Sequence, residues 1–157
     1  MTTDRFDPER LTSEYENLLK THLEFILDRY ERDPDYPFVD TKINVRTCED
    51  FATPDRAGTV LGKDILYGWV QGRAMESLAG HIGWLGRQRT FSDATARSLA
   101  SRARSALAGL VPALEKLRRA MDGRMTFIFR TDGQPLKPAD EGELRPREEI
   151  RGDANFS

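Results

Sequence analysis

The stretch DILYGWVQGRAMESLAGHIGWLG, residues 64–86, decides the fold of this 157-residue chain. Wound as a helix, it presents one stripe of large apolar side chains and a second stripe of small or apolar ones. Four positions inside the stretch, ahead of its last residue Gly86, are glycines, each of which costs about 1 kcal/mol relative to alanine inside a helix; they are Gly68, Gly72, Gly80 and Gly83. Such a sequence is favourable where neighbouring elements approach closely. It therefore predicts an inner helix that is packed on several sides.

A first helix is predicted upstream, over residues 12–32. Apolar residues recur there at steps of three and four, the period of an amphipathic helix. Ser13 followed by Glu16 fits a capping box, in which each side chain satisfies a backbone donor of the other. Asp33 and Pro34 are expected to end the helix.

Downstream, residues 92–121 predict a long outer helix with Ser92 as its N-cap. Pro112 lies inside this segment, where proline removes a backbone donor and clashes with the preceding turn. We therefore expect either a kink or two helices in succession. Gly123 stands where a C-terminal cap is expected.

The remaining segments predict short β-hairpins. Ile43 and Val45 alternate with polar residues, and the turn sequence TPDRAG at 53–58 precedes Val60 and Leu61, which could return as a second strand. Residues 125–130 alternate likewise and lead into the turn at 131–133, whereas everything from Gln134 onward is too polar to build a core.

The fold class is accordingly all-α with short β-hairpins in one domain. Its parts are a first helix (1–35), a hairpin or loop (36–62), inner and outer helices (63–122), and a hairpin with a polar tail (123–157).

Composition excludes several classes of function. The formal net charge is −2, so no global positive field attracts nucleic acid, and the arginines between Arg97 and Arg119 are best explained as a solvated helix face. Cys48 is the single cysteine, which rules out an intrachain disulfide and a cysteine metal cluster. The first ten residues do not resemble a secretory signal, and no stretch is apolar enough to cross a membrane. These features predict a cytoplasmic protein with no membrane partner.

The segment with Trp69, Gln71 and Arg73 resembles the W-x-Q-x-R signature of the N-acylglucosamine 2-epimerase family, which also includes cellobiose 2-epimerases and aldose–ketose isomerases. Residues 58–60 before the helix are similar to the family's short hairpin, and 123–135 to its strand, D-x-G turn and proline. Residues 155–157, Asn-Phe-Ser, look like the start of the family's next helix. The resemblance covers roughly residues 36–157.

This resemblance implies an (α/α)6 barrel of the six-hairpin glycosidase-like kind, of which the chain would supply the N-terminal part. The family's catalytic histidines lie in later helices, and neither His22 nor His81 matches them by motif. The resemblance further implies epimerisation or isomerisation at C2 of a mono- or disaccharide through an enediolate. A histidine pair can act as base and acid in that reaction, and no metal or other cofactor is required.

Within the resemblance, Arg73 is the expected catalytic residue, because a guanidinium can stabilise the negative charge of the enediolate. Trp69 lies one turn earlier on the same helix face and offers an apolar surface for a sugar. Without the resemblance, an arginine–aromatic contact between helices is the simpler interpretation. Tyr67 is expected either in the core or in the substrate cavity, and Gln71 points away from Arg73 in a structural role.

Glu76 departs from the family pattern, in which an aromatic residue is frequent at this position. Its carboxylate could pair with Arg73, bind sugar hydroxyls or face solvent. We place it among the substrate-binding candidates with Trp69 and Tyr67.

Two functions follow as expectations. In the first, the chain belongs to a carbohydrate epimerase or isomerase and is inactive alone. In the alternative, it is a non-catalytic helical interaction module or carbohydrate-binding module. The epimerase or isomerase function predicts exposed apolar surface on the helix at 64–86. An interaction module instead predicts helices that bury one another's apolar faces and leave none exposed. The identity of the sugar and the formation of a homodimer are left open.

Overall fold

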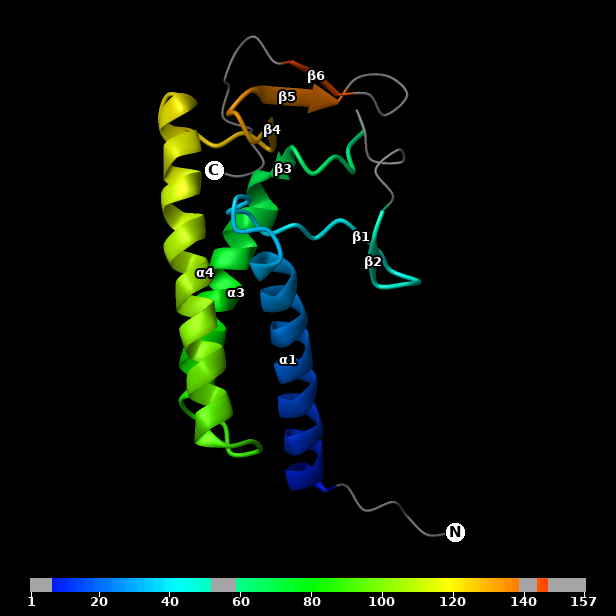
Figure 1. The fold of residues 1–157 in the computed structure, drawn as a ribbon, viewed down its shortest axis with the longest axis vertical. Coiled ribbons are helices and arrows are strands. Elements are labelled where there is room, and N and C mark those ends of the chain that lie inside the picture. Colours follow the sequence, from blue (N-terminus) through cyan, green and yellow to red (C-terminus); the bar gives the residue numbers. More distant parts are fainter. Residues whose placement is uncertain (1–6, 52–58, 139–143, 147–157) are drawn as a thin grey trace.

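The computed structural model describes residues 7–51, 59–138 and 144–146. Three helices in these residues form an elongated body, and a small sheet covers one end of it (Figure 1). The helices are α1 (Pro8–Glu31), α3 (Gly68–Leu85) and α4 (Asp93–Ala120); α1 and α4 run in one direction and α3 in the other (Figure 1). The helical class with short hairpins is therefore confirmed in outline.

In the part of the chain that the structure describes, six short strands make two antiparallel sheets. In the first, β1 (Ile43–Asn44) pairs with β2 (Glu49–Asp50). In the second, the order is β3 (Ile65–Tyr67), β4 (Ile128–Arg130), β5 (Pro135–Pro138) and β6 (Leu144–Pro146). The predicted partners of β1, Val60 and Leu61, are in neither sheet, so that pairing is wrong. The predicted turn at 53–58 lies outside the described residues.

Helix α1 begins earlier than its periodicity predicts. Asp7 is the N-cap, and its side chain accepts hydrogen bonds from the backbone of Glu9 and Arg10, while Pro8 takes the first helical position. The predicted capping box is therefore wrong, since Ser13 lies inside the helix. Glu16 instead accepts hydrogen bonds from the loop at residues 89–90.

Helix α3 begins at Gly68 and not at residue 64, because the preceding residues pair with β4. A Cβ on Gly68 would lie 2.7 Å from the backbone oxygen of Thr126, so glycine permits the segment ahead of β4 to pass this closely. One predicted close approach is thus confirmed. The other three are not: a Cβ on Gly72, Gly80 or Gly83 would meet nothing within 4 Å. The expectation that α3 is packed on several sides is wrong for the described residues.

Helix α4 is a single helix that contains Pro112, so the predicted break into two helices is wrong. Pro112 and Ala108, whose carbonyl loses its donor, are both exposed, so water can take the place of the missing hydrogen bond. Ser92 is the N-cap as predicted, and its hydroxyl accepts a hydrogen bond from Thr95 at 3.2 Å. Gly123 follows the helix with a positive φ of 78°.

The core forms where the apolar side chains of α4 pack against α1 and α3. Leu99, Ala103 and Ala106 pack with residues of α1 and α3, and Leu110, Leu114 and Leu117 pack with Leu66 and Phe129 of the sheet. Leu136 is also buried, against Ile65 and Ile128. The prediction that nothing after Gln134 builds core is therefore wrong, because β5 completes this small cluster.

Candidate functional site

An open groove of about 340 Å³ lies between α1 and α3. Most of its lining is apolar, and three side chains bring polar groups to it: Thr41, Arg73 and Ser77. The lining comes from three parts of the chain, namely α1 (Leu23, Ile26), the segment after it (Val39, Thr41) and α3 (Trp69, Val70, Arg73, Ala74, Ser77, Leu78).

Trp69 and Arg73 line this groove together, one helical turn apart on α3. Trp69 is 50% exposed, and the Arg73 side chain is 74% exposed. The Arg73 Nη1 donates a hydrogen bond to Glu76 Oε2 at 2.8 Å, as one of the alternatives for Glu76 anticipated. An exposed pair of this kind contributes only about 0–1 kcal/mol, so Arg73 is not locked in place and remains available to a ligand.

Tyr67 is not brought to the groove. It is the last residue of β3, and its ring meets that of Phe127 edge to face, with 6.0 Å between centroids. Burial raises the pKa of its phenol, as expected for a ring that packs at the sheet. The structure thus separates Tyr67 from Trp69 and Arg73.

Gln71 holds the segment that supplies the third side of the groove. Its side chain is almost fully buried, at 2% exposure. The amide oxygen accepts from the backbone N–H of Val39 at 3.1 Å, and the amide nitrogen donates to the Val39 carbonyl at 2.9 Å. The structural role predicted for Gln71 is confirmed.

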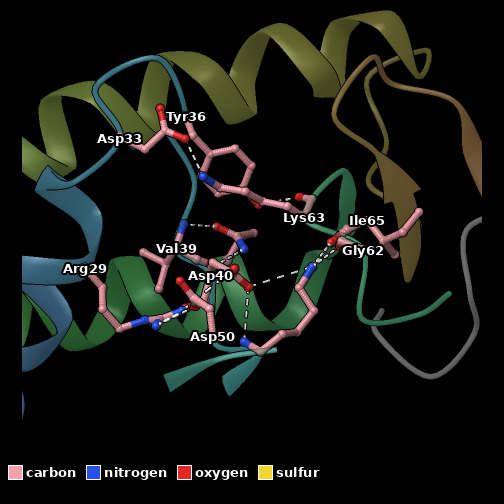
Figure 2. Close-up of polar contacts among 11 residues, drawn as sticks. Arg29, Asp33, Tyr36, Val39, Asp40, Asp50, Gly62, Lys63 and Ile65 are labelled. Atoms are coloured by element: carbon pink, nitrogen blue, oxygen red, sulfur yellow. Dashed lines mark hydrogen bonds and ion pairs between the residues drawn. The ribbon is translucent and has the colours of Figure 1, made fainter. Parts of the chain in front are cut away.

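Charged side chains fix the same segment from its other side (Figure 2). Arg29 of α1 donates to the Asp40 carbonyl at 3.3 Å and to the Asp50 carboxylate at 2.7 Å. Lys42 donates to the carbonyls of Gly62 and Ile65, just ahead of α3. Arg29, Asp40 and Lys42 each have only 11% of their side chain exposed, and breaking such a buried network is strongly destabilising.

Beside this network lies a second cavity, of about 220 Å³. Three basic side chains and three aspartates are among the residues that line it, so their charges balance and do not favour ligands of one charge. The hydrogen bond from Lys63 holds the pKa of the Asp33 carboxyl below its usual range.

The two histidines of the chain do not form an acid–base pair at the groove. His22 is exposed on α1. His81 Nδ1 lies 2.7 Å from the Ser77 carbonyl oxygen, which can only accept, so Nδ1 carries the proton. It therefore cannot act as a base toward the Ser77 hydroxyl, 3.3 Å away. Within the described ranges, no three His, Cys, Asp or Glu residues cluster as metal ligands, and no helix is long and apolar enough to cross a membrane.

Comparisons of this chain with protein-family models, curated proteins and solved structures find no match. The resemblance to the epimerase family therefore rests on the residues that carry it. Of these, Trp69, Gln71 and Arg73 lie as the spacing on a helix predicts, while Gly58 and residues 155–157 lie outside the described part of the chain.

Sequence reasoning missed two polar residues of the groove. Ser77 lies one turn after Arg73, so helical spacing could have identified it. Thr41 could not have been found in this way, since it reaches the groove only through contacts between segments that are distant in sequence.

Proposed function

We propose that this chain forms one wall of the carbohydrate site in a sugar 2-epimerase or aldose–ketose isomerase. The observation that carries the proposal is the shared position of Trp69 and Arg73 in one open groove. In this function the apolar face of a mono- or disaccharide stacks on the Trp69 indole. The guanidinium of Arg73 binds the oxygen that becomes negative when the C2 proton is removed.

The reaction needs a base to take the C2 proton and an acid to return it, on either face or to the neighbouring carbon. The family resemblance assigns both to histidines that this chain does not contain. Arg73 stays protonated at neutral pH and so cannot act as the base, which leaves it an electrostatic part. The isolated chain is accordingly expected to bind sugar without converting it.

The arrangement of the helices supports this function over a closed interaction module. Both α1 and α4 contribute to the core against the same side of α3, where Gln71, Leu78 and Leu85 are buried. The opposite side is open, with Trp69 half exposed beside an apolar groove. An inner helix of an (α/α)6 barrel would have this division, with its open side toward the barrel interior.

Binding and exchange experiments test the proposal. Cellobiose and N-acetylglucosamine would be titrated into the chain and followed by saturation-transfer NMR. We expect binding that weakens about tenfold or more in Trp69→Ala and in Arg73→Met, since each removes one principal contact. Arg104→Met is the matched control, because Arg104 is exposed on α4 and does not line the groove.

Unchanged affinity in both groove variants would overturn the assignment of the wall. In deuterated buffer we expect no deuterium at C2 of either sugar with the chain alone. Incorporation at C2 would show instead that the chain carries its own base.

A further inference from the structure

We propose that Gln71 is a positioning residue for the groove, and that it fixes Thr41 as a ligand-contacting hydroxyl on the wall that α3 does not supply. This inference rests on the proposed function. It adds a specificity-determining residue, Thr41, to the pair formed by Trp69 and Arg73. The ligand it describes is a saccharide whose ring packs on the indole and whose hydroxyls meet Thr41 and Ser77.

The backbone around Val39 has no strand partner. Residues 38–41 belong to neither sheet, yet Phe38 and Val39 are buried, so their polar backbone groups need other partners. The Gln71 amide supplies one donor and one acceptor to Val39, as a neighbouring strand would. The position of Val39 is therefore set by a side chain of α3.

Thr41 follows Val39 by two residues, and both side chains line the same groove. Only Asp40 separates the two residues along the chain, so a displacement of the Val39 backbone is expected to displace Thr41 as well. Gln71 lies between Trp69 and Arg73 in sequence but on the buried side of α3. Helix α3 thus presents Trp69 and Arg73 to the ligand directly. On its buried side, Gln71 positions Thr41 as a third contact.

The chain contains a matched control in Gln88. This side chain is also buried, at 5% exposure. Its oxygen accepts from the backbone N–H groups of Thr90 and Phe91 at 3.0 Å, and its nitrogen donates to the Phe91 carbonyl at 3.1 Å. It holds a loop beyond the far end of α3, next to Trp84, whose ring contacts that of Phe91. Each buried glutamine therefore has its own tryptophan nearby as a reporter.

The experiment compares Gln71→Met with Gln88→Met in the full chain. The chain has two tryptophans, so the indole N–H region of a ¹⁵N correlation spectrum holds one signal from each. We expect Gln71→Met to shift the Trp69 signal and weaken cellobiose binding about tenfold, while Gln88→Met shifts the Trp84 signal and leaves affinity within about twofold. A Trp69 signal that does not move in Gln71→Met would overturn the positioning role.

Gln71→Glu gives a test by rescue. At neutral pH its carboxylate places an oxygen against the Val39 carbonyl, whereas the protonated acid again offers one donor and one acceptor. Burial raises the pKa of such a carboxyl, so binding is expected to be weak at pH 7 and to recover toward the wild-type value near pH 5. Arg29, Asp40 and Lys42 surround the same segment and Arg73 lies on the same helix, so the wild type is titrated alongside at each pH. A Gln71→Glu profile parallel to that of the wild type would contradict the inference.

If the Gln71 variants unfold, Thr41→Val still tests whether the Thr41 hydroxyl contacts the ligand. Thr41 is exposed, so the substitution removes the hydroxyl with little effect on folding. We expect about a fivefold loss of cellobiose affinity with the Trp69 signal near its wild-type position. Wild-type affinity in Thr41→Val would refute the hydroxyl contact. Absence of saccharide binding by the wild type would overturn the proposed function itself, and the indole signals would still decide the role of Gln71.

Discussion

The two sides of α3 differ both in the size of their side chains and in what surrounds them. Leu78 and Leu85 on one side are buried among residues of α1 and α4, whereas Gly72, Gly80 and Gly83 on the other have open space around them. Glycine weakens a helix wherever it stands. At Gly68 this weakness is offset by the close passage of residue 126, but nothing in the described chain offsets it on the open side. The open side of α3 is therefore the side on which we propose that a ligand binds.

Leu78→Ala tests the packed side and should have the largest effect. Leu78 is 3% exposed and belongs to the core cluster shared by the three helices. Truncation leaves a cavity and should lower the free energy of unfolding by about 2–5 kcal/mol. Urea denaturation followed by circular dichroism measures this. Ala79→Ser, on the open side, should change stability by less than about 0.5 kcal/mol. Equal losses in the two variants would contradict the division of α3.

Gly68→Ala tests the one glycine of α3 that is packed. The new methyl group would lie 2.7 Å from a backbone oxygen, so α3 and the residues before β4 must move apart. We expect a loss of about 1–3 kcal/mol, as for other overpacked sites. The same urea measurement applies. A stability equal to that of the wild type would mean that the segment ahead of β4 is free to shift.

Local periodicity explains how much of this contrast the sequence could provide. The stripe of α4 and the shared position of Trp69 and Arg73 follow from a repeat of three to four residues, and both were predicted. The strand β3 was not, because Ile65 and Leu66 pair with residues of β4 near the other end of the chain. The open side of α3 was expected only through the family resemblance, since the residue pattern of a small-residue face looks the same whether or not a neighbour covers it.

Gly80→Ala tests the open side of α3 and should raise the stability, whereas the two variants above should lower it. With open space around its Cα, alanine removes the entropic cost of glycine and meets no atom. The expected result is a gain of about 0.5–1 kcal/mol in the free energy of unfolding. Gly109→Ala in α4 is the matched control. A Cβ there would lie 2.6 Å from the Tyr30 hydroxyl, so that variant should not gain stability. A loss in Gly80→Ala would reveal that this side is covered in solution.

Glu76→Gln should give the smallest effect, and it asks whether the open side is a binding surface. The Arg73–Glu76 pair has more than 70% of each side chain exposed, so its loss should change stability by less than about 0.5 kcal/mol. Its carboxylate occupies one nitrogen of the guanidinium, and its removal frees that donor for a ligand oxygen. Cellobiose affinity should therefore rise about twofold to threefold, and 0.5 M salt should reduce the difference because it screens the pair. A fall in affinity would instead place Glu76 in direct contact with the sugar, and no change at all would indicate that Arg73 does not meet the ligand.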